Sequence, residues 1–206
     1  MDAYAAVESS VNFTFKHLGF PPCDAQTIRR SVGWGDRHLL EGFVGPRNIE
    51  KALRIYRRHH AQALKQGTKF LPGAKALLEE LKKQNYKLAI ASNRPTKFSL
   101  IALRHLKIKK YFDYILCADK LTHGKPHPEI LILILKKLGV QPSQALYVGD
   151  MTIDVETGTR AGVKTIGVAT GSSRYKELKQ LKPFQIIKRV DQVLKILNHL
   201  NKRRKK

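Results

Sequence analysis

The sequence predicts an α/β fold in which a parallel sheet lies between two layers of helices, preceded by a segment made of helices alone. Two observations carry this prediction. Residues 1–66 show helical spacing of apolar residues and no strand pattern, whereas residues 67–201 alternate short apolar runs with amphipathic segments. Strands that alternate with helices pair in parallel, and the helices then cover both faces of the sheet.

Four helices are expected in the first segment. Asp24 has the side chain of an N-cap, Gly33-Trp34-Gly35 interrupts the helical pattern, and Pro46 suits the first turn of a helix. The absence of a strand pattern here predicts a separate helical unit. The expected helices cover residues 2–18, 24–30, 36–43 and 46–67.

The second segment is expected to hold five strands. The apolar run Ile130–Leu135 could be a buried strand, but Pro128 suits a first helical turn and Gly139 a helix end, which favours a helix. The expected strands cover residues 87–92, 114–117, 145–148, 164–168 and 185–187. The helices that alternate with them are expected over residues 73–81, 96–106, 128–138, 152–161, 175–181 and 190–200.

The composition is that of a globular chain. Its 206 residues are 42% hydrophobic, which is enough for a sizeable core and argues against a disordered chain or a fibre. No run reaches the roughly 18 apolar residues of a membrane span, and no signal segment opens the sequence. Cys23 and Cys117 are too few for a disulfide scaffold or a four-cysteine zinc site. We therefore expect a cytoplasmic protein without a membrane partner.

The net charge of +23 is unusually high. Twenty-nine of the 39 Lys and Arg residues lie in residues 67–206, and five of them form the closing run 202–206. One interpretation is a lysine-coated, solvated surface with a basic disordered tail over 202–206. The other is a surface that binds nucleic acid weakly and in a salt-sensitive way.

Three polar signals follow predicted strand ends or precede helices, where ligands bind in parallel sheets. The first is Ser92-Asn93, after the strand at residues 87–92 and before a helix that opens near Thr96. A hydroxyl that faces a helix N-terminus can hold a phosphate group. The alternative is an ordinary N-cap serine.

The second signal is the run Gly124-Lys125-Pro126-His127-Pro128-Glu129. Two prolines stiffen the loop around Lys125, and a rigidly presented ammonium group can hold a phosphate oxygen. The alternative is one surface lysine among many. We interpret His127, which lies between the prolines, as structural.

The third signal is Gly149-Asp150 at the end of a buried strand, with Asp154 four residues further on. If a helix begins at Thr152, the side chain of Asp154 can face back toward Asp150. Two converging carboxylates suit Mg²⁺, which prefers oxygen ligands and keeps waters and phosphate in its shell. The alternative is an N-cap, Asp150, followed by a favourable acid in the first turn.

Taken in order, these three signals resemble the second, third and fourth motifs of the haloacid dehalogenase superfamily of phosphatases. Residues 1–66 resemble the small all-helical cap of its phosphoglycolate phosphatase-like branch. Residues 67–201 resemble its Rossmann-like, three-layer core. The resemblance covers nearly the whole chain.

The resemblance implies a role for each matching residue. Ser92 and Asn93 would bind the transferring phosphoryl group, and Lys125 would neutralise its charge and steady the nucleophile. Asp150 and Asp154 would hold Mg²⁺, directly or through water. Catalytic roles would therefore fall to Ser92 and Lys125, with a small phosphorylated metabolite as substrate.

The first motif of that family, a strand ending in Asp-x-Asp-x-Thr whose first Asp attacks phosphorus, has no counterpart in the sequence. We therefore expect a sheet whose first, central strand is missing and a chain that is inactive as written. Three explanations stay open: a truncated or misassigned start, a non-catalytic relative, or a strand supplied by another chain. Asp2 is no substitute, because it heads a helix without a preceding strand.

The leading functional hypothesis is a magnesium-dependent phosphate monoester hydrolase, as a monomer or dimer. The alternative is a non-catalytic module that holds phosphate, nucleic acid or an acidic partner through its basic surface. A phosphomutase or a dehalogenase stays within the resemblance, although a dehalogenase would not need the magnesium pair.

In this branch the cap sets specificity, and Trp34 and Arg37 in the loop between cap helices are the candidates. Trp34 could instead belong to the core of the helical unit.

Overall fold

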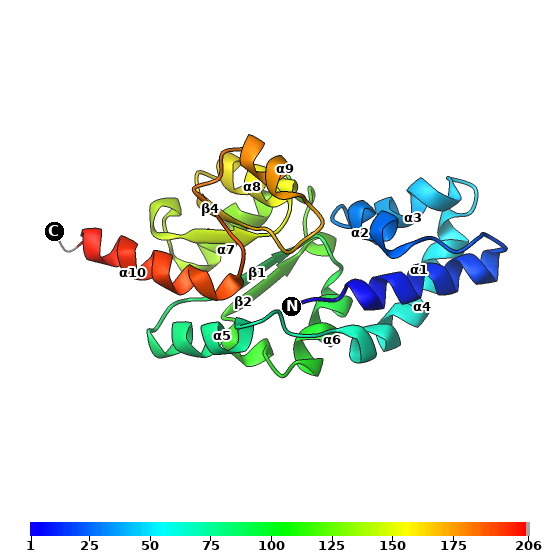
Figure 1. Ribbon diagram of the computed structural model, residues 1–206, viewed down its shortest axis with the longest axis horizontal. Coiled ribbons are helices and arrows are strands. Elements are labelled where there is room, and N and C mark those ends of the chain that lie inside the picture. The colour runs from blue at the N-terminus through cyan, green and yellow to red at the C-terminus, as the bar shows by residue number, and fades with distance from the viewer. Residues whose placement is uncertain (205–206) are drawn as a thin grey trace.

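The computed structural model describes residues 1–204, and its elements follow the order predicted from the sequence (Figure 1). The chain begins with helices alone, as expected. Asp24 caps the second of them, since its carboxylate accepts the Thr27 backbone N–H at 2.9 Å. These helices are α1 (Tyr4–Leu18), α2 (Ala25–Ser31), α3 (Asp36–Val44) and α4 (Ile49–Gly67).

Strands and helices alternate from residue 74 onward. The run that could have been a strand is helical, in α7 (Glu129–Leu138). The strands are β1 (Ala89–Ser92), β2 (Tyr114–Cys117), β3 (Leu146–Gly149), β4 (Lys164–Val168) and β5 (Gln185–Ile187). The other α-helices are α5 (Ala74–Lys83), α6 (Thr96–His105), α8 (Thr152–Arg160), α9 (Tyr175–Gln180) and α10 (Val193–Arg204). Short 3₁₀ turns lie at Lys109–Tyr111, Ala118–Lys120, Pro142–Gln144 and Val190–Gln192.

The strands form two parallel sheets. One holds β1 and β2, and the other holds β3, β4 and β5 in that order. The strand that ends at Ser92 and the strand that ends at Gly149 therefore do not pair, as expected for a sheet with an unfilled position. That a missing strand belongs between them stays a prediction.

Helices cover both faces of the strands. Residues of α5, β4, β5 and α10 share one buried cluster, which includes Leu77, Leu81, Ile166 and Val193. A second cluster packs α7 against β1 and β2 on the opposite face. This is the three-layer arrangement that the alternating pattern predicted.

The helical segment has its own core and is joined to the rest by α6. Apolar side chains of α1, α2, α3 and α4 form one cluster, and Ala63 and Leu64 of α4 pack with Phe98 and Ala102 of α6 in another. Asp2 and Lys69 exchange both backbone hydrogen bonds at 2.8 Å, so the two ends of the helical segment lie side by side. The segment therefore projects from one end of the strands (Figure 1).

Two expectations were wrong in detail. The long helix α4 begins at Ile49 rather than at Pro46, because the Asn48 N–H bonds to the Gly45 carbonyl and closes a turn there. Residues 202–204, expected in a disordered tail, continue α10, as the high helix propensity of Lys and Arg allows. Residues 205–206 lie outside the described residues. Within residues 1–204, no helix is long and apolar enough to cross a membrane.

Candidate active site

The carboxyl ends of β1 and β3 open into one cavity of about 300 Å³ beneath the helical segment. Parallel strands end at the same edge of the molecule, so Ser92 and Asp150 meet there although 58 positions separate them. The cavity is also lined from the helical segment, by Gly33, Gly35 and Asp36. All five predicted core residues line it: Ser92, Asn93, Lys125, Asp150 and Asp154.

Lys125 and Asp154 form a buried ion pair. The Lys125 Nζ lies 2.6 Å from Oδ1 of Asp154, and the side chains are only 9% and 4% exposed. The ammonium group also donates to the Tyr147 hydroxyl at 3.2 Å and to the Ala91 carbonyl at 3.4 Å. Burial disfavours the charge of Lys125, but the Asp154 carboxylate and the Tyr147 hydroxyl together outweigh it, and the pKa of Lys125 is raised. Lys125 is therefore a fixed cation.

Asp154 also holds the loop that carries Asp150. Its Oδ2 accepts the backbone N–H groups of Asp150 and Met151, each at 3.1 Å, and its Oδ1 accepts the Tyr147 hydroxyl at 2.7 Å. A Cβ on Gly149 would lie 2.2 Å from the Asp154 Cβ, so the close approach requires glycine. With Lys125 added, both carboxylate oxygens of Asp154 have partners.

Asp150 is the half-buried carboxylate that lines the cavity. Burial and the negative charge of Asp154 both raise the pKa of Asp150. The site thus holds a carboxylate whose charge is poorly compensated, next to a second carboxylate. A hard divalent cation fits such a donor set, with Asp150 as the residue able to bind it directly. Both oxygens of Asp154 already accept hydrogen bonds within the protein, and its expected role in holding such a cation stays a prediction.

The side chain of Asn93 acts as a clamp between loops. Its Nδ2 donates to the carbonyls of Gly33 and Lys125, each at 3.0 Å, and its Oδ1 accepts the Lys125 backbone N–H at 2.8 Å. These bonds position the Lys125 loop against the helical segment. The expected role of Asn93 in phosphate binding stays a prediction.

Ser92 is the last residue of β1, and its Oγ accepts the Arg94 backbone N–H at 3.1 Å. Arg94 also lines the cavity, and burial lowers its pKa. Neither Arg94 nor Tyr147 was singled out from the sequence. Their positions in the sequence could have identified both. Arg94 follows Ser92 by two residues, and Tyr147 places a hydroxyl on the strand that leads to Asp150.

The two residues expected to set specificity do not line the cavity. Trp34 is 50% exposed and lies beside His38, with ring centroids 5.8 Å apart. Arg37 forms an ion pair with Glu50 on the exposed side of α3 and α4. The predicted loop does face the site, but through Gly33, Gly35 and Asp36. The two glycines bring the backbone close to the cavity, whereas the side chains of Trp34 and Arg37 do not line it.

The helical segment is fastened across the mouth of the cavity. The Arg29 Nη2 donates to the Thr170 carbonyl at 2.6 Å, and Arg30 pairs with Glu177 at 2.6 Å. Together with the Asn93 clamp, these contacts hold the helical segment closed over the ends of β1 and β3.

Residues 1–168 match the family model described as haloacid dehalogenase-like hydrolase. This chain belongs to that family. The phosphoglycolate phosphatase of Aquifex aeolicus is 31% identical over 195 residues, covering 93% of this chain and 92% of that protein. A phosphoglycolate phosphatase of Pseudomonas putida is 29% identical over 196 residues, covering 91% of this chain and 72% of that protein.

Solved structures agree with this family assignment. A haloacid dehalogenase-like family hydrolase from Streptococcus pneumoniae superposes with a TM-score of 0.85 at 26% identity, covering 95% of this chain and 92% of that one. A predicted phosphoglycolate phosphatase from Haemophilus somnus gives a TM-score of 0.84 at 25% identity, with the same coverage. The resemblance inferred from the three motifs is thus confirmed at the level of the haloacid dehalogenase-like fold.

Proposed function

We propose that this protein is a magnesium-dependent hydrolase of phosphate monoesters on a small metabolite. One observation carries the proposal: Ser92, Lys125, Asp150 and Asp154 converge in one cavity at the ends of β1 and β3. Four unrelated surface residues have no physical reason to meet, whereas phosphoryl transfer needs cations and oriented donors around the reacting group. The named activity of the Aquifex relative supports phosphoglycolate as the first substrate to test.

Each residue of the site would have its own role in binding the phosphate group or the metal. Lys125 would attract a phosphate oxygen, exchanging its long contact with Ala91 for the ligand while Asp154 keeps it charged. The Ser92 hydroxyl would donate to a second oxygen. Asp150 would hold Mg²⁺, which when bound would offset the negative charge of the phosphoryl group. The helical segment would limit the access of bulk water to the site, while hydrolysis still needs one water molecule to take up the phosphoryl group.

We further propose that the space between β1 and β3 receives one more parallel strand, which carries the nucleophilic Asp. The side chains of both strands are only half-buried along their whole length, whereas β4 is buried from Thr165 to Val168. Ile90, Ala91, Tyr147 and Val148 face the cavity from its two sides. Central strands of such a sheet are normally buried on both faces, so this exposure supports an unfilled position.

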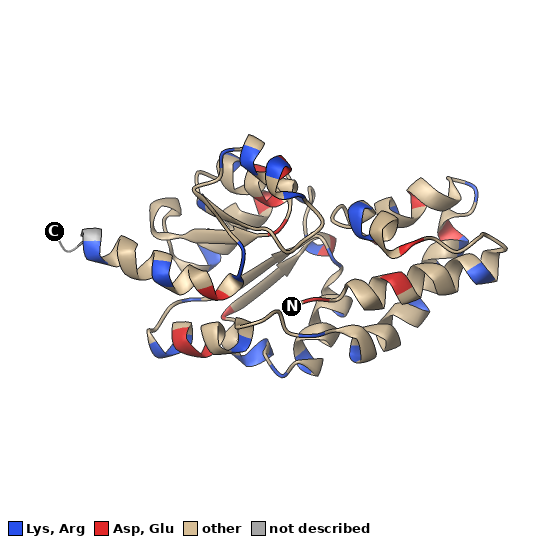
Figure 2. Ribbon diagram, in the orientation of Figure 1, with Lys and Arg blue, Asp and Glu red and all other residues tan. Residues whose placement is uncertain are grey.

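The charge distribution does not favour nucleic-acid binding as the main role. Lys and Arg are spread over helices of both parts of the molecule rather than gathered along one (Figure 2). Such a surface suits a dissolved protein with anionic ligands. We therefore place the substrate in the cavity.

The test needs the chain as written and a strand-extended chain. The extension is a designed segment of alternating Val and Ile ending in Asp-x-Asp-x-Thr, joined ahead of Met1. With Mg²⁺ and phosphoglycolate, the strand-extended chain should release phosphate and the chain as written should not. An extension whose first Asp is Asn serves as the inactive control.

Asp150→Asn in the strand-extended chain should abolish magnesium-dependent release. Glu41→Gln, which changes an exposed acid on α3, should leave it unchanged. Near-normal turnover of the Asp150 variant would remove the metal role. Turnover by the chain as written would place the nucleophile within residues 1–206.

A further inference from the structure

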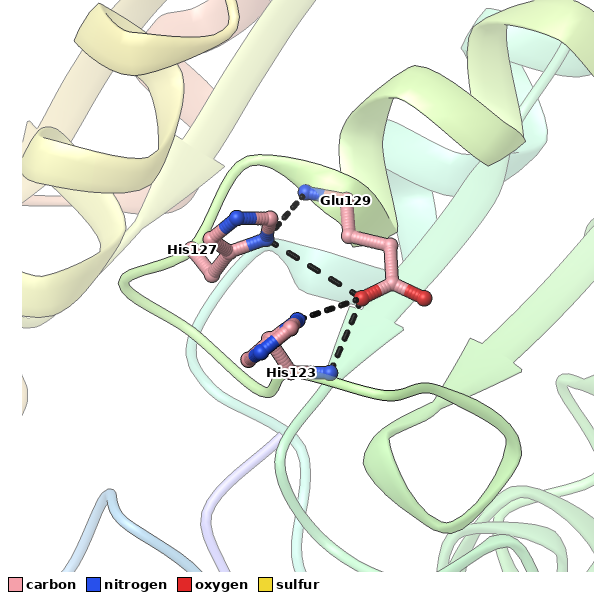
Figure 3. Close-up of side chains that lie close together, drawn as sticks. All are labelled: His123, His127 and Glu129. Carbon is pink, nitrogen blue, oxygen red and sulfur yellow. Dashed lines mark hydrogen bonds and ion pairs between the residues drawn. The ribbon is translucent and has the colours of Figure 1, made fainter.

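Two histidines of the loop that precedes α7 and the first residue of that helix, a glutamate, meet outside the cavity (Figure 3). The Nδ1 of His123 lies 3.5 Å from Oε2 of Glu129, and the Nδ1 of His127 lies 4.0 Å from the same oxygen. The two imidazole rings lie 4.6 Å apart between centroids. One nitrogen from each ring and one carboxylate oxygen lie within 4.8 Å of one another. The proposed hydrolase site uses none of these three side chains.

The carboxylate of Glu129 is held in place by backbone donors. Its Oε1 accepts the Thr122 N–H at 3.1 Å and its Oε2 accepts the His123 N–H at 2.8 Å. These two bonds and the nearby His123 hold the pKa of Glu129 below its usual range. Each oxygen keeps a further lone pair for a ligand, and the carboxylate is fixed by the type of outer contact that supports metal ligands.

One ring nitrogen of His127 is unprotonated. The Glu129 backbone N–H donates to Nδ1 at 3.3 Å, so the single lone pair of that nitrogen accepts this N–H, and a metal bound there would replace the long hydrogen bond. Pro126 and Pro128 on either side restrict the backbone that carries the ring and reduce the backbone entropy lost when the loop is fixed. Neutral imidazole is the form that binds a metal.

The spacing is close to what a tetrahedral metal requires. Ligand atoms at zinc-to-ligand distances of about 2.0–2.1 Å lie roughly 3.4 Å apart. The side chains of His123 and His127 are 60% and 49% exposed. They therefore have room to turn and bring the ligand atoms, now within 4.8 Å of one another, to the separation that zinc requires. Two imidazoles and one carboxylate suit Zn²⁺ and similar borderline cations, and not Mg²⁺, which prefers oxygen ligands.

We propose that His123, His127 and Glu129 form a surface site for Zn²⁺, with a fourth position left to water. The site would close the loop between Thr122 and Glu129, and Lys125 lies within that loop. Bound metal would thus stiffen the segment that presents Lys125 without entering the cavity. The proposal does not depend on the hydrolase activity.

The test is a titration of the metal-free 206-residue chain with Zn²⁺ against a coloured competing chelator. One equivalent should bind, and His123→Ala and His127→Ala should each weaken binding by about tenfold or more. His105→Ala removes another exposed histidine, at the end of α6, and should change nothing. Glu129 is left intact because its bonds to Thr122 and His123 support the loop.

Two readouts keep the test independent of folding and of activity. X-ray absorption of the zinc-loaded chain should show two imidazole ligands and no sulfur. Excess Mg²⁺ should not displace the zinc. Wild-type affinity in the His127 variant, or a sulfur ligand from Cys23, would overturn the proposal.

Discussion

His60 is a titratable side chain buried where α4 meets α1 and α6. It is 2% exposed, stacks on Tyr56 with ring centroids 4.7 Å apart and meets Phe98 edge-on. The Ser10 hydroxyl donates to the Ala6 carbonyl, so His60 Nδ1, 3.0 Å away, carries a proton and donates to it. Burial, with a smaller contribution from the positive charge of Arg94, lowers the pKa of His60 to about 3.

We expect stability to fall as the pH drops from about 6.5 to 3, because the unfolded chain gains a proton at His60 that the folded chain does not. The loss should reach roughly 4–5 kcal/mol, which is the pKa difference expressed as free energy. Urea unfolding followed by Trp34 fluorescence should show a shallower pH dependence for His60→Gln. His105→Gln should keep the parent slope, and an unchanged slope for His60→Gln would contradict the assignment.

At the same scale, the sequence predicted which residues meet in the cavity but not what each one touches. Ser92 and Asp150 lie close together because both follow the carboxyl ends of parallel strands, which depends on the backbone topology and not on side-chain contacts. The engagement of Asn93 with Gly33 depends on how the helical segment docks, which no local pattern specifies. The outward orientation of Trp34 has the same origin, since a turn with two glycines can present a side chain to either side.

Elements depend on close contacts that a sequence pattern does not reveal. Helix α8 packs against β4 through Gly158, where a Cβ would lie 1.7 Å from Oγ1 of Thr165 and 3.0 Å from its Cβ. Thr165 is 4% exposed and its hydroxyl donates to the Val163 carbonyl, so it has little room to move. From the sequence, a glycine inside a helix predicts only a modest loss of helix propensity.

Gly158→Ala should therefore lower the free energy of unfolding by about 1–3 kcal/mol, because the helix must move away from the strand. Gly42→Ala is the matched control: Gly42 is exposed on α3 and an added Cβ meets nothing within 4 Å. It should raise stability by up to roughly 1 kcal/mol through helix propensity. Urea denaturation of both variants checks the opposite signs. Equal stability of Gly158→Ala and the parent would show that α8 and β4 can separate at no cost.

Element order was predictable because apolar spacing differs between helices and strands, but element ends depend on local hydrogen bonds. The turn at Gly45 that delays α4 to Ile49 involves a backbone bond with no side-chain signature. The extension of α10 through residue 204 depends on a continued helix that a run of basic residues neither requires nor forbids.

At the scale of the whole molecule, the two sheets do not share a hydrogen-bonded edge. β1 pairs with β2 along one of its edges, and β3 pairs with β4 along one of its edges. The other edge of β1 and the other edge of β3 are not joined by backbone hydrogen bonds. The sequence analysis expected that the strands ending at Ser92 and Gly149 do not pair, and they do not; that a further strand belongs between them stays a prediction. The unpaired N–H and C=O groups of these two edges border the cavity, and each one that is shielded from water costs about 1–3 kcal/mol, which is large beside a domain's total stability of roughly 5–15 kcal/mol.

We therefore expect the 206-residue chain to melt broadly and at low temperature, and the strand-extended chain to melt sharply at a higher one. A second extension, in which proline replaces every other residue of the added strand, serves as the control. Proline cannot donate to a ladder, so this chain should gain little although its length is the same. Circular dichroism and calorimetry on the three chains make the comparison. If the 206-residue chain already shows a sharp two-state melt, and the extension leaves its midpoint unchanged, then β1 and β3 need no strand between them.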